Sequence, residues 1–232
     1  MDHIREGKLG LLVPQIEMDQ AERYRDSYDP KRLRQLNALF VKHQTWQCPT
    51  LIGPEATGLA ADSMANDFAG YPYLRYVPQA SQDSWKRLLS TRFSPEQIPN
   101  LRVYFAYKRV LTAAMHRAGV KFLSGTDVQG GTTYLPGFSL HDELAIFVQV
   151  GFSPLEALQT ATINPAHFLG REKELGTVER GKLADLVLLD ANPLDNIGNT
   201  RGISGVIVNG AYLEKEALQR MLAEVESATS KK

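Results

Sequence analysis

The sequence predicts an α/β protein in which helices and strands alternate over residues 29–127, as in a portion of a βα barrel, followed by a smaller β-rich part. Apolar residues recur at helical spacing in segments such as DPKRLRQLNALFVKHQ (29–44). Short apolar runs such as VKFLSGTD (120–127) lie between these segments and read as strands. After residue 170 the sequence changes to short Val, Leu and Ile runs separated by Gly, Asn and Pro. That pattern is typical of strands in an antiparallel or mixed sheet.

The first expected elements are a helix and a strand. Asp29 and Pro30 suit the start of a helix over residues 29–44. Its apolar stripe consists of Leu33, Leu36, Leu39 and Phe40. The run TWQCPTLIG (45–53) is expected to be a strand closed by glycine, with Cys48 buried in it. Residues 54–94 lack clear periodicity, and their aromatic residues either line an apolar pocket or pin the segment to the core.

The remaining elements follow from caps and spacing. Residues 94–119 predict a helix that ends at Gly119, with a potential break at Pro99. Helices are also expected over 140–151 and 153–170, the second with Ser153 as its N-cap and Pro154 at its first position. Strands are expected within 175–194 and 203–213, and a surface helix over 214–226.

Composition excludes several classes of protein. Lys plus Arg and Asp plus Glu each total 26, so the formal charge is zero, and no basic cluster interleaved with aromatic residues predicts nucleic-acid binding. The single cysteine excludes an intrachain disulfide and fits a reducing compartment. No apolar run approaches the roughly 18 residues of a membrane span, and the first residues lack the pattern of a signal peptide. A cytoplasmic protein with no membrane partner is expected.

Four motifs carry a resemblance to a known family. They are AGVKFLSGTD (118–127), LHDELAIFVQVGFSPLEALQTATINPAHFLG (140–170), LGTVERGKLADLVLLDANPL (175–194) and VIVNG (206–210). In this order they resemble the carboxyl-terminal portion of the amidohydrolase superfamily, particularly its imidazolonepropionase and Xaa-Pro dipeptidase-like branch. The resemblance implies a partial (βα) TIM-like barrel of the metal-dependent hydrolase type over residues 1–170. Part of a small β-sandwich with a C-terminal helix is implied over 171–232, and the chain is expected to be truncated before the sixth barrel strand.

The resemblance also assigns Asp127 a function. In this family the aspartate that closes the eighth strand binds a divalent metal and takes a proton from the attacking water, and Asp127 matches that position. A carboxylate beside a divalent cation can orient the nucleophile, whose pKa the cation lowers. The alternative is that Asp127 is a turn residue at the end of a strand.

The metal ligands that the family implies are incomplete here. The sequence has five histidines and no His-x-His pair, which the family places on its first strand. His3 matches the histidine of the sixth strand and is expected as a second ligand. The implied cofactor is therefore a divalent metal ion, zinc first, bound weakly or with residues of a second chain.

Residues around the glycine-rich segment after Asp127 are candidates for substrate contacts. Gly130, Tyr134 and Glu143 are predicted to bind substrate, and His141 to polarise the substrate carbonyl or to stabilise the oxyanion. The alternative is that His141 caps a helix and that Glu143 favours its positive amino end.

Three functions remain open from the sequence. The leading one is a hydrolase of amide or ester bonds, such as a dipeptidase, that acts on a small-molecule substrate. The second is a metal-independent esterase that uses Ser124 or Ser139 with His141. The third is a non-catalytic remnant. Because a slice of a parallel barrel has open edges and an uncovered apolar face, a homo-oligomer is expected.

Overall fold

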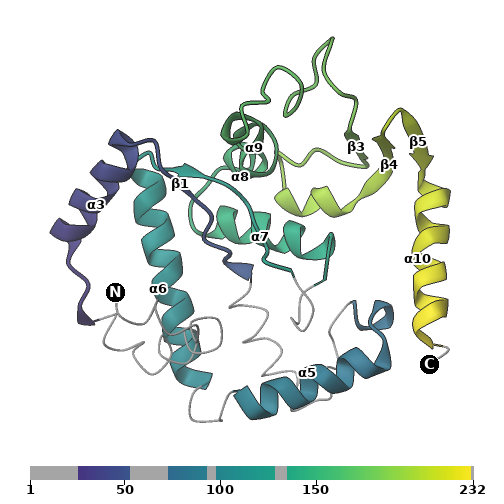
Figure 1. Cartoon of the computed structure of the whole chain (residues 1–232), viewed down its shortest axis with the longest axis horizontal. Helices are drawn as coiled ribbons and strands as arrows, with labels where there is room; N and C mark the ends of the chain where they lie inside the picture. The colour runs from purple at the N-terminus through teal and green to yellow at the C-terminus, as the bar shows by residue number, and fades with distance from the viewer. Residues whose placement is uncertain (1–25, 53–72, 93–97, 129–134, 231–232) are drawn as a thin grey trace, which may run out of the picture.

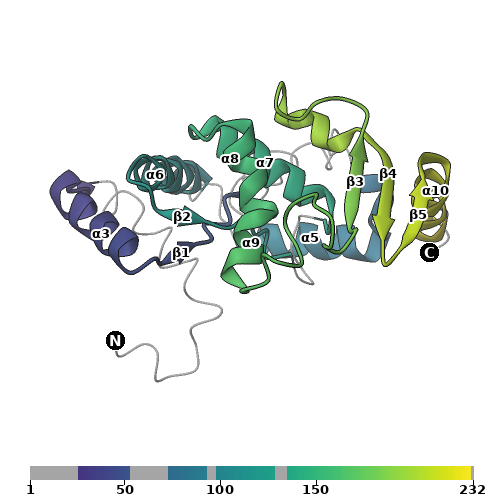
Figure 2. The same ribbon diagram turned by 90° about the horizontal axis from the view of Figure 1, so that it is seen from above.

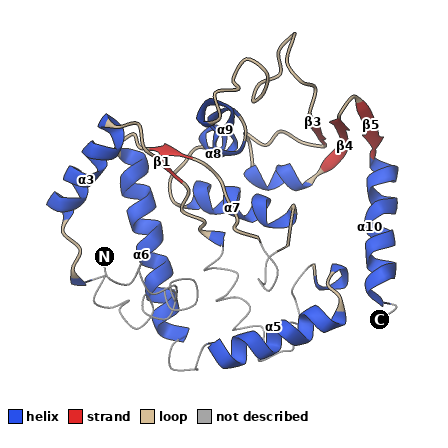
Figure 3. Ribbon diagram, viewed as in Figure 1, coloured by secondary structure: helices blue, strands red, loops and turns tan. Residues whose placement is uncertain are grey.

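The structure, a computed structural model, describes residues 26–52, 73–92, 98–128 and 135–230. Within these ranges the fold is α/β, with a parallel pair of strands and an antiparallel sheet of three strands (Figures 1 and 3). The elements are α3 (Pro30–Lys42), β1 (Trp46–Gln47), η2 (Leu74–Tyr76), α5 (Gln79–Arg92), α6 (Ile98–Arg117), β2 (Lys121–Phe122), α7 (Phe138–Gln149), α8 (Pro154–Ala161), α9 (Ile163–Phe168), β3 (Leu186–Leu189), η4 (Ile197–Arg201), β4 (Ile203–Val208), β5 (Ala211–Glu214) and α10 (Lys215–Ser230). None of the described helices is long and apolar enough to cross a membrane.

The parallel pair consists of β1 and β2. Trp46 lies opposite Lys121 and Gln47 opposite Phe122, and Leu123 N–H donates to Gln47 O at 2.9 Å. Helix α6 precedes β2 along the chain and connects to it through Gly119, whose φ of 81° suits a residue without a side chain. The predicted strands 45–53 and 120–127 are therefore present and adjacent, although each ladder spans only two residues.

Two helices differ from the prediction for local reasons. The helix expected over 153–170 divides into α8 and α9 at Thr162. Pro165 lacks an N–H and its ring would clash with the carbonyl of Ala161, the last residue of α8, so a continuous helix cannot form.

Helix α5 lies in the segment that was expected to be irregular. Its short apolar stripe, Trp85, Leu88 and Leu89, is surrounded by polar residues and did not predict a helix.

The core beneath the parallel pair is aromatic. Phe122, Phe147 and Phe152 are at most 5% exposed and meet edge to face, with ring centroids 4.7–6.0 Å apart. Phe147 comes from α7 and Phe152 from the turn before α8. Ser153 then starts α8 with the predicted cap, because its hydroxyl accepts from Glu156 N–H while the Glu156 carboxylate accepts from Ser153 N–H. The core thus joins β2 to α7 and α8.

The antiparallel sheet has the order β3-β4-β5. It lies on the other side of α7, α8 and α9 from β1 and β2 (Figures 1 and 2). Helix α10 follows β5 and contacts both β4 and β5. Val187 and Leu188 are successive residues of β3, so their side chains point to opposite faces, and both are exposed. Each face of this sheet therefore presents apolar surface.

Aromatic residues of the 54–94 segment that are described pin it to the core. Tyr73 and Tyr76 stack on Phe138 at the start of α7, with centroid distances of 4.2 and 5.5 Å. Trp85 of α5 is 5% exposed. Of the two alternatives for this segment, these residues support attachment to the core rather than the lining of an open pocket.

Candidate functional site

The carboxyl ends of β1 and β2 lie side by side, because the strands are parallel. Cys48 follows β1, and Gly125 follows β2. A Cβ atom on Gly125 would collide with Sγ of Cys48, so the absence of a side chain at Gly125 permits this close approach. The chain then turns at Thr50 and at Asp127, with φ angles of 48° and 49°. A β-branched threonine rarely adopts this left-handed conformation, and strained backbone of this kind clusters at functional sites.

Asp127 is exposed at this turn, where an aspartate tolerates positive φ. This conformation agrees with the reading of Asp127 as a turn residue and leaves its carboxylate accessible from solvent. The proposed functions of Asp127 in metal binding and catalysis stay predictions.

Cys48 differs from expectation, because it is exposed rather than buried in a strand. Its thiol nevertheless lies against Gly125, and this partial burial is the largest cause that raises the pKa of the thiol. The nearby negative charges of Glu143 and Asp127 raise that pKa further. Cys48 therefore stays a neutral thiol near pH 7, which does not suit a nucleophile.

Glu143 has no exposed surface. Its Oε1 accepts from Leu51 N–H at 3.0 Å and its Oε2 from Ile52 N–H at 2.6 Å. A carboxylate of α7 thus holds the segment that leaves β1 directly after the strained Thr50. The contacts give Glu143 a structural role, and they differ from the expected interaction with the amino end of its own helix. The expected contact of Glu143 with substrate stays a prediction.

His141 lies two residues before Glu143 on α7, so the two side chains point to different faces of the helix. Nδ1 of His141 lies 3.0 Å from Oγ1 of Thr200 in η4. Burial is the largest cause that lowers the pKa of His141, followed by the nearby positive charge of Arg201, while Asp142 acts in the opposite direction. His141 is therefore neutral at pH 7.

Arg201 connects three segments around this histidine. Its Nη2 lies 2.5 Å from Asp142 Oδ1, and its Nη1 donates to the hydroxyl of Tyr73 at 2.8 Å. Thr200 and Arg201 were not predicted as site residues. They lie 59 positions from His141 and Asp142 in a polar turn, and no spacing in the sequence relates them to α7.

Neither candidate serine forms a hydrogen bond to a histidine within the described ranges. Ser124 Oγ bonds to Thr160 Oγ1, whose own proton goes to Ala157 O at 2.6 Å. Ser139 is 3% exposed in α7. This arrangement does not favour the metal-independent esterase.

The described residues contain no group of three or more His, Cys, Asp or Glu side chains that could hold a metal ion. Asp127 is the only predicted ligand among them. His3, Gly130 and Tyr134 lie outside the described residues.

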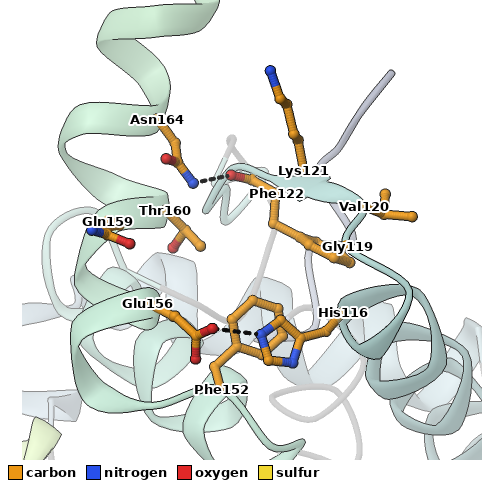
Figure 4. Close-up of a pocket in the computed structure, with 10 residues that line it drawn as sticks. All are labelled: His116, Gly119, Val120, Lys121, Phe122, Phe152, Glu156, Gln159, Thr160 and Asn164. Atoms are coloured by element: carbon orange, nitrogen blue, oxygen red, sulfur yellow. Dashed lines mark hydrogen bonds and ion pairs between the residues drawn. The ribbon is translucent and has the colours of Figure 1, made fainter. Parts of the chain in front are cut away.

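A second candidate site is a pocket of about 250 Å³ at the amino end of β2 (Figure 4). His116 stacks on Phe152 and its Nε2 lies 3.2 Å from Glu156, while Asn164 donates to Phe122 O at 3.0 Å. In parallel α/β folds the amino ends of strands contribute to stability, and catalytic groups lie at the carboxyl ends. The paired polar groups here join α6, α8 and α9 to β2, so this pocket is a structural junction.

Comparisons with known proteins agree with the fold. The sequence profile of the Amidohydrolase family matches residues 108–213. The imidazolonepropionase of Shouchella clausii (strain KSM-K16) is 32% identical over 135 residues, which cover 53% of this chain and 30% of the relative. The imidazolonepropionase of Geobacillus sp. (strain WCH70) is 31% identical over 115 residues, which cover 50% of this chain and 27% of the relative. The chain thus spans about 30% of the length of these relatives.

Solved structures show the same fold. A bottromycin amidohydrolase matches with a TM-score of 0.62 at 22% identity, covering 79% of this chain and 40% of that one. A Xaa-Pro dipeptidase with bound methionine in its active site matches with a TM-score of 0.53 at 24% identity, covering 80% and 37%. Over residues 108–213, the chain therefore resembles the amidohydrolase superfamily.

Proposed function

We propose that this chain acts in the hydrolysis of amide bonds in a small-molecule substrate, with ester bonds as a second class. The observation that carries the proposal is the position of Asp127, an accessible carboxylate at the carboxyl end of β2 inside the segment that matches the family. Relatives that are named imidazolonepropionase support the same reaction class.

The reaction that this geometry supports is general base catalysis. The Asp127 carboxylate takes a proton from a water molecule, and the water oxygen forms a bond to the substrate carbonyl carbon. When the tetrahedral intermediate collapses, the C–N bond breaks and the proton passes to the leaving amine. The products are a carboxylic acid and an amine.

A divalent metal, with zinc as the first choice, belongs to this proposal because the family generally uses one. When bound, such an ion would lower the pKa of the attacking water. The described side chains alone do not fit a metal centre, since Asp127 has no neighbouring group of ligands among them. Further ligands would have to come from outside the described ranges or from a second chain, so no catalytic step is assigned to the metal here.

The proposal is tested by assaying the purified chain against a panel of dipeptides and acylated amines. We expect hydrolysis that is lost after dialysis against a chelator and restored by Zn²⁺ or Mn²⁺. Full activity in excess chelator would contradict the metal part alone. No turnover of any amide or ester, with metal added to a folded protein, would contradict the function as a whole.

The finer architecture is part of the same proposal. The parallel pair with its preceding helix α6 supports a partial TIM-like barrel over residues 1–170, and the β3-β4-β5 sheet supports part of a β-sandwich over 171–232.

A cytoplasmic location, which the single cysteine favours, would be contradicted by recovery of the protein in a secreted fraction.

We also propose that the chain forms a homo-oligomer. The exposed apolar residues on both faces of β3 and the 58% exposed Tyr212 on β5 support this, because apolar surface left open on a sheet can be covered by a second copy of the chain. Light scattering is expected to give a mass of at least twice 25.8 kDa at micromolar concentration. A monomer across the accessible concentration range would contradict it.

A further inference from the structure

The first turn of α7, which contains His141, follows the segment in which β2 leads to Asp127. A helix that follows a strand in an α/β unit begins near the carboxyl end of that strand. The first turn of α7 is therefore expected near the end of β2 that leads to Asp127. The inference below rests on the proposed function of this site.

The hydrogen bonds of Thr200 fix the tautomer of His141. A threonine hydroxyl has one proton and can accept through its oxygen. Oγ1 of Thr200 lies 2.8 Å from Ile197 O, a carbonyl that can only accept, so the proton of Thr200 is used there. Oγ1 must therefore accept from His141, which places the ring proton on Nδ1. In the neutral ring, Nε2 then has a lone pair and no proton.

The surrounding charges keep the ring neutral. Arg201 faces it from η4 and disfavours a second positive charge, and burial acts in the same direction. Asp142, on the same helix, favours the charged ring but is itself paired with Arg201. Tyr73 of the segment before η2 accepts from Arg201 and adds no charge. Nε2 of His141 is consequently an acceptor near neutral pH.

We propose that Thr200 is a positioning residue that holds His141 as a hydrogen-bond acceptor, and that Nε2 of His141 accepts the N–H of a secondary amide substrate. An unprotonated Nε2 cannot donate to an oxyanion, so the role expected from the sequence, polarising the carbonyl, is replaced by recognition of the N–H. Esters and tertiary amides lack this N–H. The site therefore prefers secondary amides to both.

The first test is the tautomer itself, read from two-bond ¹H–¹⁵N correlation spectra, with His141→Gln used to assign the signals of His141. We expect the Nδ1–H tautomer in the natural protein and in Thr200→Ser, which keeps the hydroxyl. Thr200→Val has nearly the same shape but cannot accept, so its ring is expected to change to the Nε2–H tautomer. An Nε2–H ring in the natural protein would overturn the inference, as would an unchanged tautomer in a folded Thr200→Val.

The second test compares a secondary amide, its N-methylated form and the matching ester. Thr200→Val is expected to lower kcat/KM for the secondary amide about tenfold, the effect of one lost hydrogen bond, and to leave the other two unchanged. An equal decrease for all three would overturn the acceptor role. If the natural protein hydrolyses none of them, the proposed function fails and the substrate preference fails with it, whereas the tautomer spectra still decide the role of Thr200.

Discussion

Glu143→Gln is expected to lower the free energy of unfolding by about 3 kcal/mol. The natural carboxylate accepts from two backbone N–H groups, and a glutamine of the same shape offers one oxygen and one NH₂ group. One bond to a charged acceptor, worth about 1.5–3 kcal/mol, is lost, and one buried N–H then faces another donor at a cost of about 1–3 kcal/mol. Relief from burying a charge offsets part of this sum.

The measurement is chemical denaturation of Glu143→Gln beside a matched surface control. Glu174→Gln removes the carboxylate of an exposed pair with Arg171, and it is expected to change stability by less than about 1 kcal/mol. If Glu143→Gln were as stable as Glu174→Gln, the carboxylate would not be what holds Leu51 and Ile52.

The expected destabilisation has a consequence for the site. The bonds to Leu51 and Ile52 immediately follow Thr50, whose left-handed conformation costs of the order of 1–3 kcal/mol and persists only if the surroundings enforce it. The two bonds from the buried Glu143 fix the backbone directly after Thr50 and so help to hold this conformation. The residue predicted to contact substrate therefore shapes the site through the backbone of a segment about 90 positions earlier.

Local patterns were sufficient to predict most elements of the fold, although not helix α5. Asp29 and Pro30 begin α3, and Ser153 begins α8 with a reciprocal cap, because both signals act within four residues. The apolar run before Asp127 predicted β2 for a similar reason. The prediction of one helix over 153–170 was wrong in one respect. The apolar residues keep their helical spacing through Pro165, but the backbone is interrupted at Thr162.

The contacts within the site could not be predicted in the same way. Glu143 bonds to Leu51 and Ile52, and His141 bonds to Thr200, and each pair is brought together only by tertiary packing. A single sequence contains the residue types but not these pairings. For the same reason the sequence could not indicate whether the ring of His141 donates or accepts, because that depends on where the proton of Thr200 goes.

Asp127→Asn is expected to reduce amide hydrolysis by about 10²–10⁴-fold, because an amide side chain cannot take a proton from water. The fold should change little. Asp127 is exposed at a φ of 49°, a conformation that asparagine also tolerates, so the melting temperature is expected to stay close to that of the natural protein. A change in activity at unchanged stability separates a catalytic carboxylate from a residue that only forms the turn.

Asp195→Asn is the matched control, since Asp195 is also exposed in a turn of the family-matched segment. Its activity is expected to equal that of the natural protein. If Asp127→Asn kept activity within about threefold, Asp127 would not be the base, and labelling by a serine-directed phosphonate would then test the esterase alternative. If the natural protein and both variants were equally inactive while folded, the non-catalytic remnant would be the better account. The activities of Asp127→Asn and of its control thus distinguish the three functions that the sequence leaves open, because only one of them uses the carboxylate at the end of β2 as a base.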